Sequence, residues 1–569
     1  MELSGAHIIW ECLTREGVST VFGYPGGAVL NLYDALLDFP AMHHVLARHE
    51  QGACHMADGY ARASGQVGVV IATSGPGATN LVTGLATAML DSVPLVAITG
   101  QVRSQLIGTD AFQEVDVTGI TLPITKHNYL VQRAEDIVPV LREAFALAAT
   151  GRPGAVLVDI TTDAQKAKTE FDWEGHVPHR HLRHLPPRPD PEQLQQALKL
   201  IKAAKRPIIL AGRGIDLSAA RQEVLAFAEK TSTPIAMTLL ALGVIPASHR
   251  LNLGMMGMHG EAWTNQAIQE SDLLLAFGMR FDDRVTGDLK TYAPHAKKIH
   301  IEIDASEIHK NVKVDAPILG DLRETLRVLL PQVKAKDHCD WLEHVAALRG
   351  NVNADAILED HGSLQAPQVI HELWKGTDGK ATVVTDVGQH QMWEAQYYKH
   401  DEQKSLITSG GLGTMGFALP AAIGAKLACP EKEVWVIAGD GGFQMNMQEL
   451  MTLVQEGIKV NIAIINNGYL GMVRQWQELF YQSRYAATPM LNPDFVKLAA
   501  AFGIPGRVVT ARSEVADAIT EARATEGPFL LEFQVEQETS VYPMVPAGAS
   551  LHNMLRRETA EPAQIGTRT

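Results

Sequence analysis

The sequence predicts an α/β protein of three doubly wound domains, each built on a parallel sheet. Short apolar runs alternate with longer stretches of helical periodicity, a pattern typical of parallel α/β folds. The chain has 569 residues, and at roughly 100–200 residues per domain this length suits about three or four domains. Two polar stretches, 175–191 and 350–367, have the composition of linkers and divide the chain.

Strand candidates occur in all three segments, and several are followed by glycine-containing turns. They cover residues 45–47, 67–73, 93–99, 207–211, 272–277, 298–304, 433–438 and 459–465. A helix is expected after the second of these strands, to about residue 90, and another from 444 to about 455. Histidines in the first linker lie at irregular spacing among prolines, which favours a solvated linker over a metal site. These are His176, His179, His181 and His184.

Composition indicates a soluble, cytoplasmic protein. The formal net charge of −15 argues against nucleic acid as a partner. Apolar stretches at 81–100 and 412–427 are interrupted by Asp91 and by prolines, so they read as buried elements and no membrane partner is expected. The N-terminus lacks the pattern of a signal peptide. The cysteines are scattered without a C-x-x-C pair, which argues against disulfides and zinc: Cys12, Cys54, Cys339 and Cys429.

Two polar motifs follow predicted strands in the last segment. Gly439-Asp440-Gly441 combines a hard oxygen ligand with glycines that let the backbone approach a phosphate, and a helix N-terminus follows. Asn466-Asn467 follows the next strand, and open parallel sheets bind ligands at this edge. Asp440, the amide of Asn467 and the carbonyl of Tyr469 are the predicted magnesium ligands, with diphosphate and water completing the shell. Each motif alone could be an ordinary turn.

The pair of motifs, with 24 residues between Gly441 and Asn466, resembles the thiamine diphosphate signature. Glu50 follows a predicted strand and resembles the glutamate that, in this family, favours the reactive imino form of the coenzyme's pyrimidine. Alone it would be an ordinary residue at a helix start. Met415, in 410–416, resembles the bulky residue that holds the coenzyme bent, and otherwise would be core.

Further segments resemble the biosynthetic, FAD-containing catalytic (large) subunit of acetohydroxyacid synthase, also called acetolactate synthase. They are 22–28, 50–53, 56–62, 73–80, 100–102, 110–114, 253–260, 280–287, 386–393, 468–477 and 545–550. The resemblance implies the fold of the thiamine diphosphate-dependent decarboxylases and carboligases. It implies a pyrimidine-binding domain at 1–170, a central FAD-associated domain at 190–335, a pyrophosphate- and metal-binding domain at 366–545, and a tail at 546–569.

Such an enzyme decarboxylates pyruvate and transfers the remaining two-carbon unit to a second pyruvate or to 2-ketobutyrate. The products are 2-acetolactate and 2-aceto-2-hydroxybutyrate, precursors of branched-chain amino acids. By resemblance, Arg284 holds the carboxylate of the acceptor and Trp476 favours the larger alkyl group. Phe112 and Met258 complete the wall, with Gln113 and Lys126 as polar neighbours. Read alone, Phe112 and Met258 would be core residues and Arg284 a surface ion pair with Asp282 or Asp283.

Cofactor contacts are also carried over residue by residue. Those expected for thiamine diphosphate are Tyr24, Pro25, Gly26, Glu50, Pro76, Asn80, Gln113, Gly388, Gln389, His390, Gly413, Met415, Gly439, Asp440, Gly441, Gly442, Asn467, Tyr469, Leu470, Gly471 and Met472. Those expected for FAD are Arg152, Gly212, Arg213, Gly214, Thr238, Leu239, Met258, His259, Gly278, Arg280, Asp282, Arg284, Glu302, Ile303, Asp304 and Asp321. Two positions depart from the family pattern: Arg213 stands where glycine is more frequent, and Cys54 where a smaller residue is usual. The flavin would be a structural relic, because joining two ketoacids involves no net redox step.

Other functions on the same scaffold remain as alternatives. An FAD-dependent pyruvate oxidase or a simple ketoacid decarboxylase would share the coenzyme motifs, but segments 110–114, 280–287 and 472–477 favour the ligase. An inactive regulatory subunit would be expected to have lost Glu50, Asp440 or Asn467. The resemblance further implies a homodimer with active sites across the interface, possible pairing into tetramers, and a small regulatory subunit.

Overall fold

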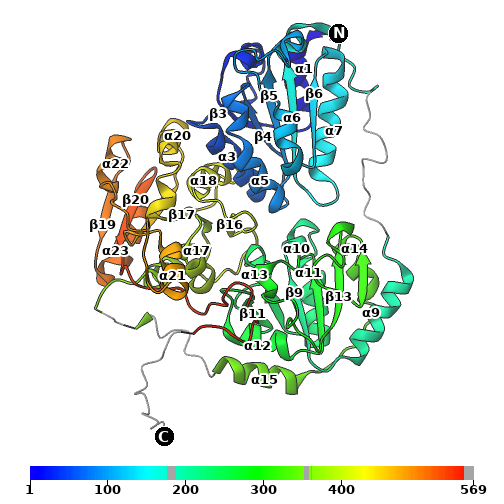
Figure 1. Ribbon diagram of the computed structural model, residues 1–569, viewed down its shortest axis with the longest axis vertical. Helices are drawn as coiled ribbons and strands as arrows, with labels where there is room; N and C mark the ends of the chain where they lie inside the picture. Colours follow the sequence, from blue (N-terminus) through cyan, green and yellow to red (C-terminus); the bar gives the residue numbers. More distant parts are fainter. Residues whose placement is uncertain (176–187, 351–357, 360–361, 557–569) are drawn as a thin grey trace.

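The computed structural model describes residues 1–175, 188–350, 358–359 and 362–556, and within them lie three six-stranded sheets (Figure 1). We call the regions around these sheets the first, middle and third domains. The histidine-containing part of the first predicted linker, 176–187, and most of the tail lie outside the described residues. In the described part of the chain, no helix is both long enough and apolar enough to cross a membrane.

All strands of the first sheet are parallel, and helices cover both of its faces. The strands are β2 (Thr20–Gly23), β3 (His43–Leu46), β4 (Gly68–Ala72), β5 (Leu95–Gln101), β6 (His127–Val131) and β7 (Ala155–Thr161). The helices are α1 (Gly5–Arg15), α2 (Leu30–Ala35), α3 (Glu50–Ser64), α4 (Pro76–Thr79), α5 (Val82–Leu90), α6 (Val117–Thr121), α7 (Ile137–Ala149) and α8 (Thr162–Lys166). A separate antiparallel pair joins β1 (Glu2–Ser4) to β8 (Lys168–Glu170).

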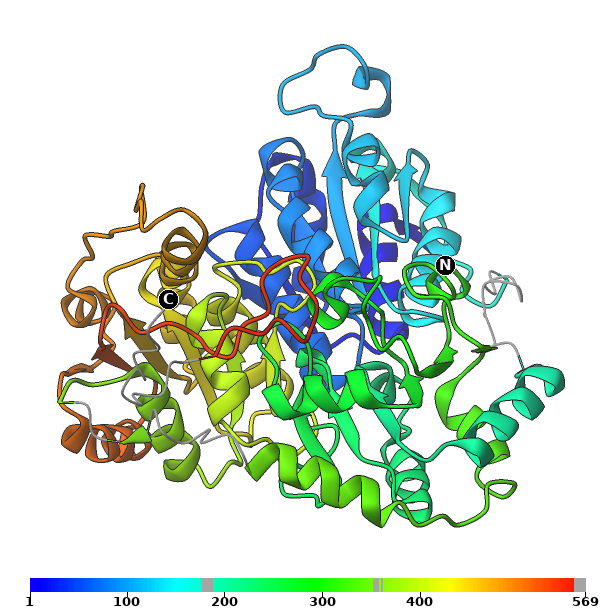
Figure 2. The ribbon, with the colours of Figure 1, turned by 60° about the horizontal axis from the view of Figure 1, so that its bottom comes forward.

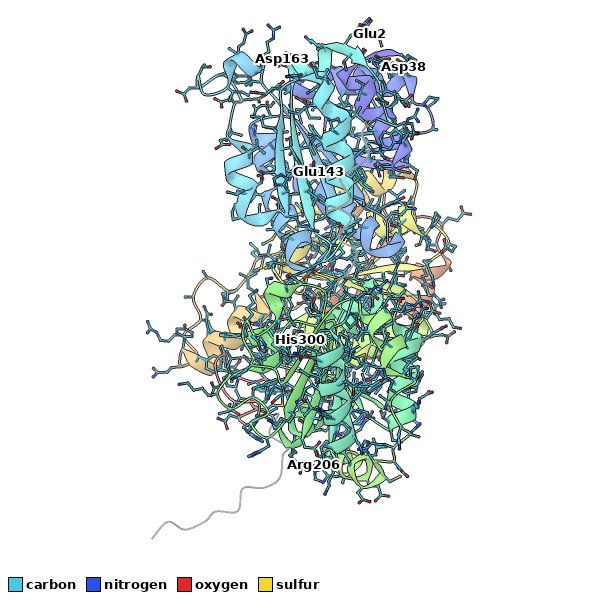
Figure 3. The ribbon with its side chains drawn as sticks, turned by 90° about the vertical axis from the view of Figure 1, so that its right-hand side faces the viewer. Glu2, Asp38, Glu143, Asp163, Arg206 and His300 are labelled. Atoms are coloured by element: carbon cyan, nitrogen blue, oxygen red, sulfur yellow. The ribbon has the colours of Figure 1, made fainter. Side chains whose placement is uncertain are left out.

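The middle sheet is also parallel, and it lies at the opposite end of the molecule from the first. Figure 3 shows this separation, with Asp163 near one end and Arg206 near the other. Its strands are β9 (Pro207–Ala211), β10 (Ile235–Met237), β11 (Asn252–Met255), β12 (Leu273–Phe277), β13 (Lys297–Glu302) and β14 (Ala316–Leu319). Its helices are α9 (Pro191–Ala203), α10 (Gly214–Leu217), α11 (Arg221–Thr231), α12 (Ala262–Glu270), α13 (Asp283–Thr286), α14 (Leu322–Leu329) and α15 (Cys339–Gly350).

The third domain lies beside both of the others (Figure 1). Its parallel strands are β15 (Thr382–Thr385), β16 (Leu406–Thr408), β17 (Val434–Gly439), β18 (Asn461–Asn466), β19 (Gly506–Val509) and β20 (Phe529–Gln534). Its helices are α16 (Ala366–Gly376), α17 (Gln389–Tyr397), α18 (Ala418–Ala428), α19 (Asp440–Phe443), α20 (Leu450–Glu456), α21 (Gly471–Phe480), α22 (Phe495–Ala501) and α23 (Arg512–Ala524).

These elements confirm the predicted fold class, and every predicted strand is present with its ends within two residues of the expectation. The single helix predicted from 444 to 455 is wrong. The chain instead forms α19, a 3-10 turn at Met447–Glu449, and then α20. Asn446 interrupts the helix, because its φ of −136° is not helical and its side chain donates a hydrogen bond to the carbonyl of Gly416, 2.7 Å away.

Strand order locates the ligand-binding edges. Counted in chain order within each sheet, the first and third sheets both read 2-1-3-4-6-5, and the middle sheet reads 3-2-1-4-5-6. The latter order is that of dinucleotide-binding folds, and in open parallel sheets ligands bind at the carboxyl edge where the strand order reverses. That point lies between β2 and β4, between β9 and β12, and between β15 and β17. The predicted cofactor turns at 24–26, 212–214 and 439–441 each follow one of these strands.

The first and third domains share one hydrophobic core, which forms where α3 packs against α18. Gly59 and Gly424 allow the two backbones to touch: a Cβ at Gly59 would lie 2.0 Å from the carbonyl oxygen of Ala421, and one at Gly424 would lie 1.8 Å from that of Met56. These pairings mean that the helices run antiparallel. The start of α3 therefore lies beside the end of α18, away from the loop at 410–416 that precedes α18.

Candidate functional site

Asp440 and Asn467 come together because they follow adjacent parallel strands, β17 and β18. The carboxylate of Asp440 is buried and accepts hydrogen bonds from the amide of Gly468 at 3.1 Å and from Nδ2 of Asn492 at 2.6 Å. Burial raises the pKa of Asp440 above its usual value. A bound cation would offset that cost of burying a negative charge, so this carboxylate suits a metal ligand.

The amide of Asn467 is oriented by its neighbours. Its Oδ1 accepts the amide N–H of Tyr469 at 3.1 Å, and its Nδ2 donates to Oε1 of Gln389 at 3.3 Å. The side-chain oxygen and the start of the Tyr469 turn are thus held next to each other. A carboxylate, an amide oxygen and a backbone carbonyl on one edge form a donor set that fits Mg²⁺.

A small cavity of about 60 Å³ lies against these loops. Its lining includes the predicted contacts Gly388, Gln389, His390, Met415, Gly439, Asp440, Gly441, Gly442, Asn467, Tyr469, Leu470, Gly471 and Met472. Glycine is required where the walls meet: a Cβ at Gly442 would lie 2.3 Å from Oδ1 of Asp386, and one at Gly471 would lie 2.1 Å from Oε1 of Gln389. Backbone amides therefore reach the cavity without intervening side chains, as a diphosphate cradle needs.

His390 contributes a neutral ring to this cavity. Its Nε2 accepts the amide N–H of Gly439 at 3.2 Å, and burial lowers its pKa to about 4. The ring consequently has no positive charge at neutral pH. An anion bound here would therefore meet backbone dipoles and not a positively charged ring.

A second, larger cavity of about 640 Å³ lies where the three domains meet. Of the predicted flavin contacts it is lined by Arg152, Gly212, Arg213, Gly214, Thr238, Leu239, Met258, His259, Gly278, Arg280, Asp282, Arg284, Glu302, Ile303 and Asp321. Asp304 lies outside the lining and pairs with Arg152 at 3.4 Å. Trp476, Gly413 and Met472 line the end toward the third domain, and Gly388 and Met472 also line the small cavity.

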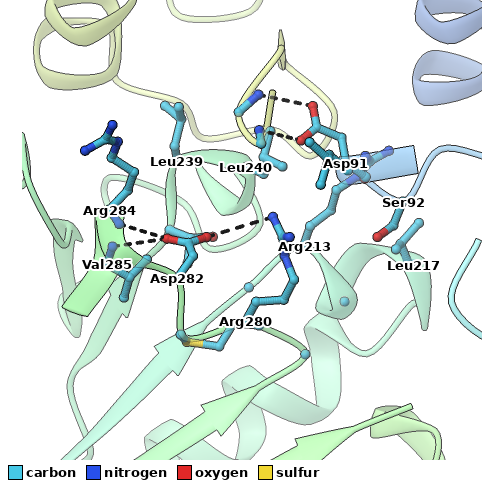
Figure 4. Close-up of a pocket in the computed structure, with 18 of the residues that line it drawn as sticks. Asp91, Ser92, Arg213, Leu217, Leu239, Leu240, Arg280, Asp282, Arg284 and Val285 are labelled. Atoms are coloured by element: carbon cyan, nitrogen blue, oxygen red, sulfur yellow. Dashed lines mark hydrogen bonds and ion pairs between the residues drawn. The ribbon is translucent and has the colours of Figure 1, made fainter. Parts of the chain in front are cut away.

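Arg284, Met258 and Trp476 therefore face one space. Nη1 of Arg284 lies 3.4 Å from Asp283 and 3.5 Å from Sδ of Met258, while its side chain is 58% exposed. Figure 4 shows the turn that carries it: Asp282 caps α13 by accepting the amides of Arg284 and Val285, and faces Arg280 at 3.9 Å. The ion pair with Asp283 thus leaves more than half of the Arg284 side chain exposed, where it can meet a carboxylate.

The middle-domain end of this cavity has close backbone contacts and a buried acid. A Cβ at Gly212 would lie 2.2 Å from the carbonyl oxygen of Gly278, so the two loops at the switch point touch. Burial raises the pKa of Glu302 to about 7. Arg213 donates to the backbone carbonyl of Asp91, and burial followed by the nearby charge of Arg62 lowers its pKa to about 10.

The coenzyme contacts predicted in the first domain, Glu50 among them, form a separate cluster at the carboxyl edge of the first sheet. Oε2 of Glu50 accepts from Nδ2 of Asn80 at 2.9 Å. The turn at 24–26 lies against Thr73, and Gln113 lies against Gly75, where a Cβ would be 3.0 Å from that of Gln113. In the described part of the chain, neither cavity is lined by any of these predicted contacts, which are Tyr24, Pro25, Gly26, Glu50, Pro76, Asn80 and Gln113.

Phe112 and Lys126 are placed differently from the rest. Phe112 is 87% exposed, on the segment between β5 and β6 that projects from the first domain (Figure 2). Nζ of Lys126 donates to the carbonyls of Leu147 and Thr150 at the end of α7, and burial lowers its pKa to about 8. In the part of the chain that the structure describes, neither side chain lines the two cavities.

Comparison with known proteins agrees with this architecture. Three family descriptions of thiamine pyrophosphate enzymes match: the N-terminal TPP binding domain at residues 3–120, the central domain at 194–329 and the C-terminal TPP binding domain at 386–533. The chain is 50% identical to the acetolactate synthase large subunit of Corynebacterium glutamicum, over 96% of this chain and 89% of that protein. It is 49% identical to the acetolactate synthase of Mycobacterium bovis, over 96% and 91%. It is 46% identical to the acetolactate synthase isozyme 2 large subunit of Escherichia coli, over 98% and 100%.

This chain belongs to the acetolactate synthase family of thiamine pyrophosphate enzymes. Membership explains why the first and third sheets share one strand order, since both are thiamine pyrophosphate-binding domains by their family matches. It also confirms the resemblance drawn from the motifs.

Several polar residues beside the family's coenzyme turns were not predicted. Asn492 reaches both Asp440 and Asn466, the latter at 3.0 Å between Nδ2 and Oδ1. Gln475 accepts from Nε2 of Gln389 at 2.9 Å. Asp386 accepts the amides of Val387, Gly416 and Ala418, and burial raises its pKa to about 6. Asp386 and Gln475 lie in segments that resemble the family, 386–393 and 468–477, whereas Asn492 lies in none of them.

Proposed function

We infer that this chain is the catalytic subunit of an acetolactate synthase. It decarboxylates pyruvate and transfers the two-carbon unit to a second pyruvate or to 2-ketobutyrate, a step in branched-chain amino acid biosynthesis. The observation that carries this inference is the connection between the two cavities: Gly388 and Met472 line both, so the large cavity ends beside the diphosphate cradle. The lining of the large cavity includes a cation, Arg284, and apolar side chains such as Met258 and Trp476.

Thiamine diphosphate, when bound, would supply the carbon nucleophile and would stabilise the electron pair that stays behind when carbon dioxide leaves. The amides around Gly441 and Gly471 would hold its diphosphate. Asp440, Asn467 and the carbonyl of Tyr469 would hold Mg²⁺, which would supply positive charge to balance the diphosphate. The buried carboxylate with raised pKa supports a cation at this position. Met415, which lines the small cavity, is proposed to support the bent coenzyme.

Selection of the second ketoacid is assigned to the large cavity. Arg284 binds the acceptor's carboxylate, because an exposed guanidinium can form paired hydrogen bonds to both carboxylate oxygens. Trp476 and Met258 line the same space and are proposed to contact the alkyl group. An apolar wall of this kind distinguishes a methyl from an ethyl group by about 1–3 kcal/mol.

FAD is the cofactor proposed for the remainder of the large cavity. The middle sheet has the strand order of dinucleotide-binding folds, and the cavity opens at its switch point. Nδ1 of His259 in the lining is buried and has no hydrogen-bond partner among the described residues, as expected of a group that meets a polar ligand. The arginines Arg152 and Arg213 supply positive charge for a diphosphate.

We propose that the working unit is a homodimer in which Glu50 of one chain completes the cradle of the other. Glu50 and Arg62 lie at opposite ends of α3, about 18 Å apart at 1.5 Å per residue. Arg62 reaches the start of the 410–416 loop through the carbonyl of Thr408, so Glu50 points to the far end of the helix pair. A symmetric partner would bring an equivalent Glu50 to each cradle.

We further propose limits for the domains, a cellular location and additional partners. The domain limits 1–170, 190–335 and 366–545, with a tail at 546–569, are supported by the three family matches, which fall within the first three ranges. A cytoplasmic location is supported by four free cysteines. A small regulatory subunit is supported by the names of relatives called large subunits, and dimers could pair into tetramers.

The test is incubation with pyruvate and 2-ketobutyrate together, in the presence of thiamine diphosphate, Mg²⁺ and FAD, with both acetohydroxyacids quantified. The proposal predicts carbon dioxide release matched by acetohydroxyacid. Acetaldehyde as the main product would indicate a decarboxylase instead, and peroxide or a reduced electron acceptor would indicate an oxidase. Either result would overturn the assignment.

A further inference from the structure

Asp91 lies at the end of α5, buried where the three domains meet. Its carboxylate accepts three hydrogen bonds: from the amide of Gly410 at 3.1 Å, from the amide of Gly411 at 2.7 Å, and from Nη2 of Arg62 at 2.8 Å. The dashed lines on Asp91 in Figure 4 mark the two bonds to the loop. Its backbone carbonyl accepts from Arg213 of the middle domain. One residue of the first domain thus holds a loop of the third.

The loop at 410–416 is shaped to approach this carboxylate. A Cβ at Gly411 would lie 2.8 Å from Oδ1 of Asp91, and one at Gly410 would lie 2.8 Å from Cγ of Leu240. Glycine at both positions allows the backbone to enter the space between the first and middle domains. The close approach is therefore specific to this loop and this carboxylate.

The other end of the loop is held by a second buried carboxylate. Asp386 accepts the amide of Gly416 at 3.0 Å, and the hydroxyls of Thr87 and Thr414 are hydrogen bonded at 2.8 Å. Between these anchors, Gly413 lines the large cavity and Met415 lines the small one. The loop is thus part of the wall of both cavities, and Asp91 fixes the end that enters the three-domain junction.

We propose that Asp91 is a positioning residue for the coenzyme, which holds the 410–416 loop so that Met415 meets the thiamine diphosphate. The inference rests on the proposed function, because it takes Met415 as a coenzyme contact. Asp91 lines the large cavity but not the small one, so it is proposed to act on the thiamine diphosphate through the loop. Its carboxylate is suited to this, since three donors converge on it and charge-assisted hydrogen bonds are stronger than neutral ones.

The test compares Asp91→Asn with Asp58→Asn. Asparagine at position 91 keeps the shape but has one acceptor oxygen, so at least one of the three donors would face an NH₂ group. Asp58 is equally buried and binds the other side of Arg62, at 2.5 Å from its Nε, but the structure gives it no bond to the loop among the described residues. Both variants weaken the buried ion cluster, and only the first disturbs the loop.

The dissociation constant of thiamine diphosphate is measured by fluorescence titration in the presence of Mg²⁺, and the thermal midpoint by calorimetry. We expect both variants to lower the midpoint, with the coenzyme dissociation constant raised about tenfold by Asp91→Asn and less than about twofold by Asp58→Asn. Equal effects of the two variants on that constant, or an unchanged constant for Asp91→Asn, would overturn the inference.

If Asp91→Asn does not fold, Thr87→Val removes a weaker link between α5 and the same loop. It should raise the dissociation constant by a factor of about three, and an unchanged constant would overturn the inference. Failure of the unmodified protein to bind thiamine diphosphate would instead overturn the proposed function. The two failures are therefore distinguishable.

Discussion

Glu50 shows at the residue scale how position gives a carboxyl group a chemical task. It is the first residue of α3, and Asn80 holds its Oε2 at 2.9 Å. Changing Glu50→Gln should leave FAD and metal binding largely intact and slow exchange of the coenzyme's C2 proton by about 10²–10⁴-fold, the range for loss of general acid–base catalysis. Exchange is measured by quenched-flow deuterium labelling and NMR at saturating coenzyme.

Glu11→Gln on helix α1 is the matched control, because it also removes one carboxylate from the first domain. In the described part of the chain, the one ion pair of Glu11 is with Arg15. Its exchange rate should equal that of the unmodified protein. An unchanged rate in Glu50→Gln would end the proposed role of Glu50.

Trp476 is the residue on which acceptor choice depends in this account. It lines the same large cavity as Arg284 and packs edge-on against Phe480 at 5.4 Å between ring centroids. Changing Trp476→Leu should shift competition toward pyruvate as acceptor by about tenfold, because contact with the extra methylene of 2-ketobutyrate is lost. The ratio of the two products is measured at equal concentrations of the acceptors.

The control is Phe480→Leu, which alters the same aromatic pair from outside the lining of the described cavity. It should leave the product ratio within about twofold of the original. A ratio that is unaltered in Trp476→Leu, or altered equally in both, counts against the assignment.

At the scale of elements, the contact between the start of α3 and α20 should respond to pH. Glu449, at the beginning of α20, accepts the amide of Arg48 at 3.0 Å, and burial raises its pKa to about 7, above the ordinary value for glutamate. Protonation is then easier in the folded state than in the unfolded one. The contribution of protonated Glu449 to the free energy of unfolding is fully present below about pH 4.5 and is lost as the pH rises through about 7.

Glu449→Gln should therefore be less sensitive to pH than the unmodified protein. As the pH rises from 5 to 8, the unmodified protein should lose on the order of 1–3 kcal/mol more of its free energy of unfolding than the variant does. Denaturant unfolding across that range checks it, with the exposed Glu431→Gln as control. Parallel pH profiles for Glu449→Gln and the unmodified protein would contradict the assigned titration.

The two loops after β17 and β18 should depend on metal to hold the coenzyme. Asp440 and Asn467 are brought together by strand pairing, but a diphosphate adds negative charge to a buried carboxylate. Removal of Mg²⁺ by a chelator should release thiamine diphosphate, as measured by the coenzyme that remains after gel filtration. Restored Mg²⁺ should restore binding, and full retention in chelator would refute the ligand assignment.

Sequence patterns predicted these elements well because their signals are local. Apolar runs gave the strands, and Gly-Asp-Gly and Asn-Asn marked their ends. The wrong helix at 444–455 reflects a long-range contact, since Asn446 leaves helical geometry to bind Gly416. From the sequence pattern alone, Asp91 is only a charged residue that interrupts the apolar stretch 81–100. Its partners lie 29 residues away in Arg62 and 319 and 320 away in the loop, and no local pattern carries such pairings.

For the whole molecule, the main point is the separation of Glu50 from the diphosphate cradle of its own chain. Antiparallel packing of α3 on α18 places Glu50 at the far end from the 410–416 loop. Phe112, 87% exposed on its projecting segment, also lines neither cavity of its own chain among the described residues. Sequence motifs pointed to Glu50 and to the Asp440 and Asn467 loops. Only the packing of the domains shows that Glu50 lies away from those loops within one chain.

Mixing two inactive variants, Glu50→Gln and Asp440→Asn, tests this most directly. The dimers are dissociated together and reassociated, and acetolactate formation from pyruvate is measured. If each site takes Glu50 from one chain and Asp440 from the other, each mixed dimer contains one intact site and activity returns to about a quarter of the unmodified level. If the mixture stays as inactive as its components while reassociated unmodified dimers recover, the shared site is contradicted.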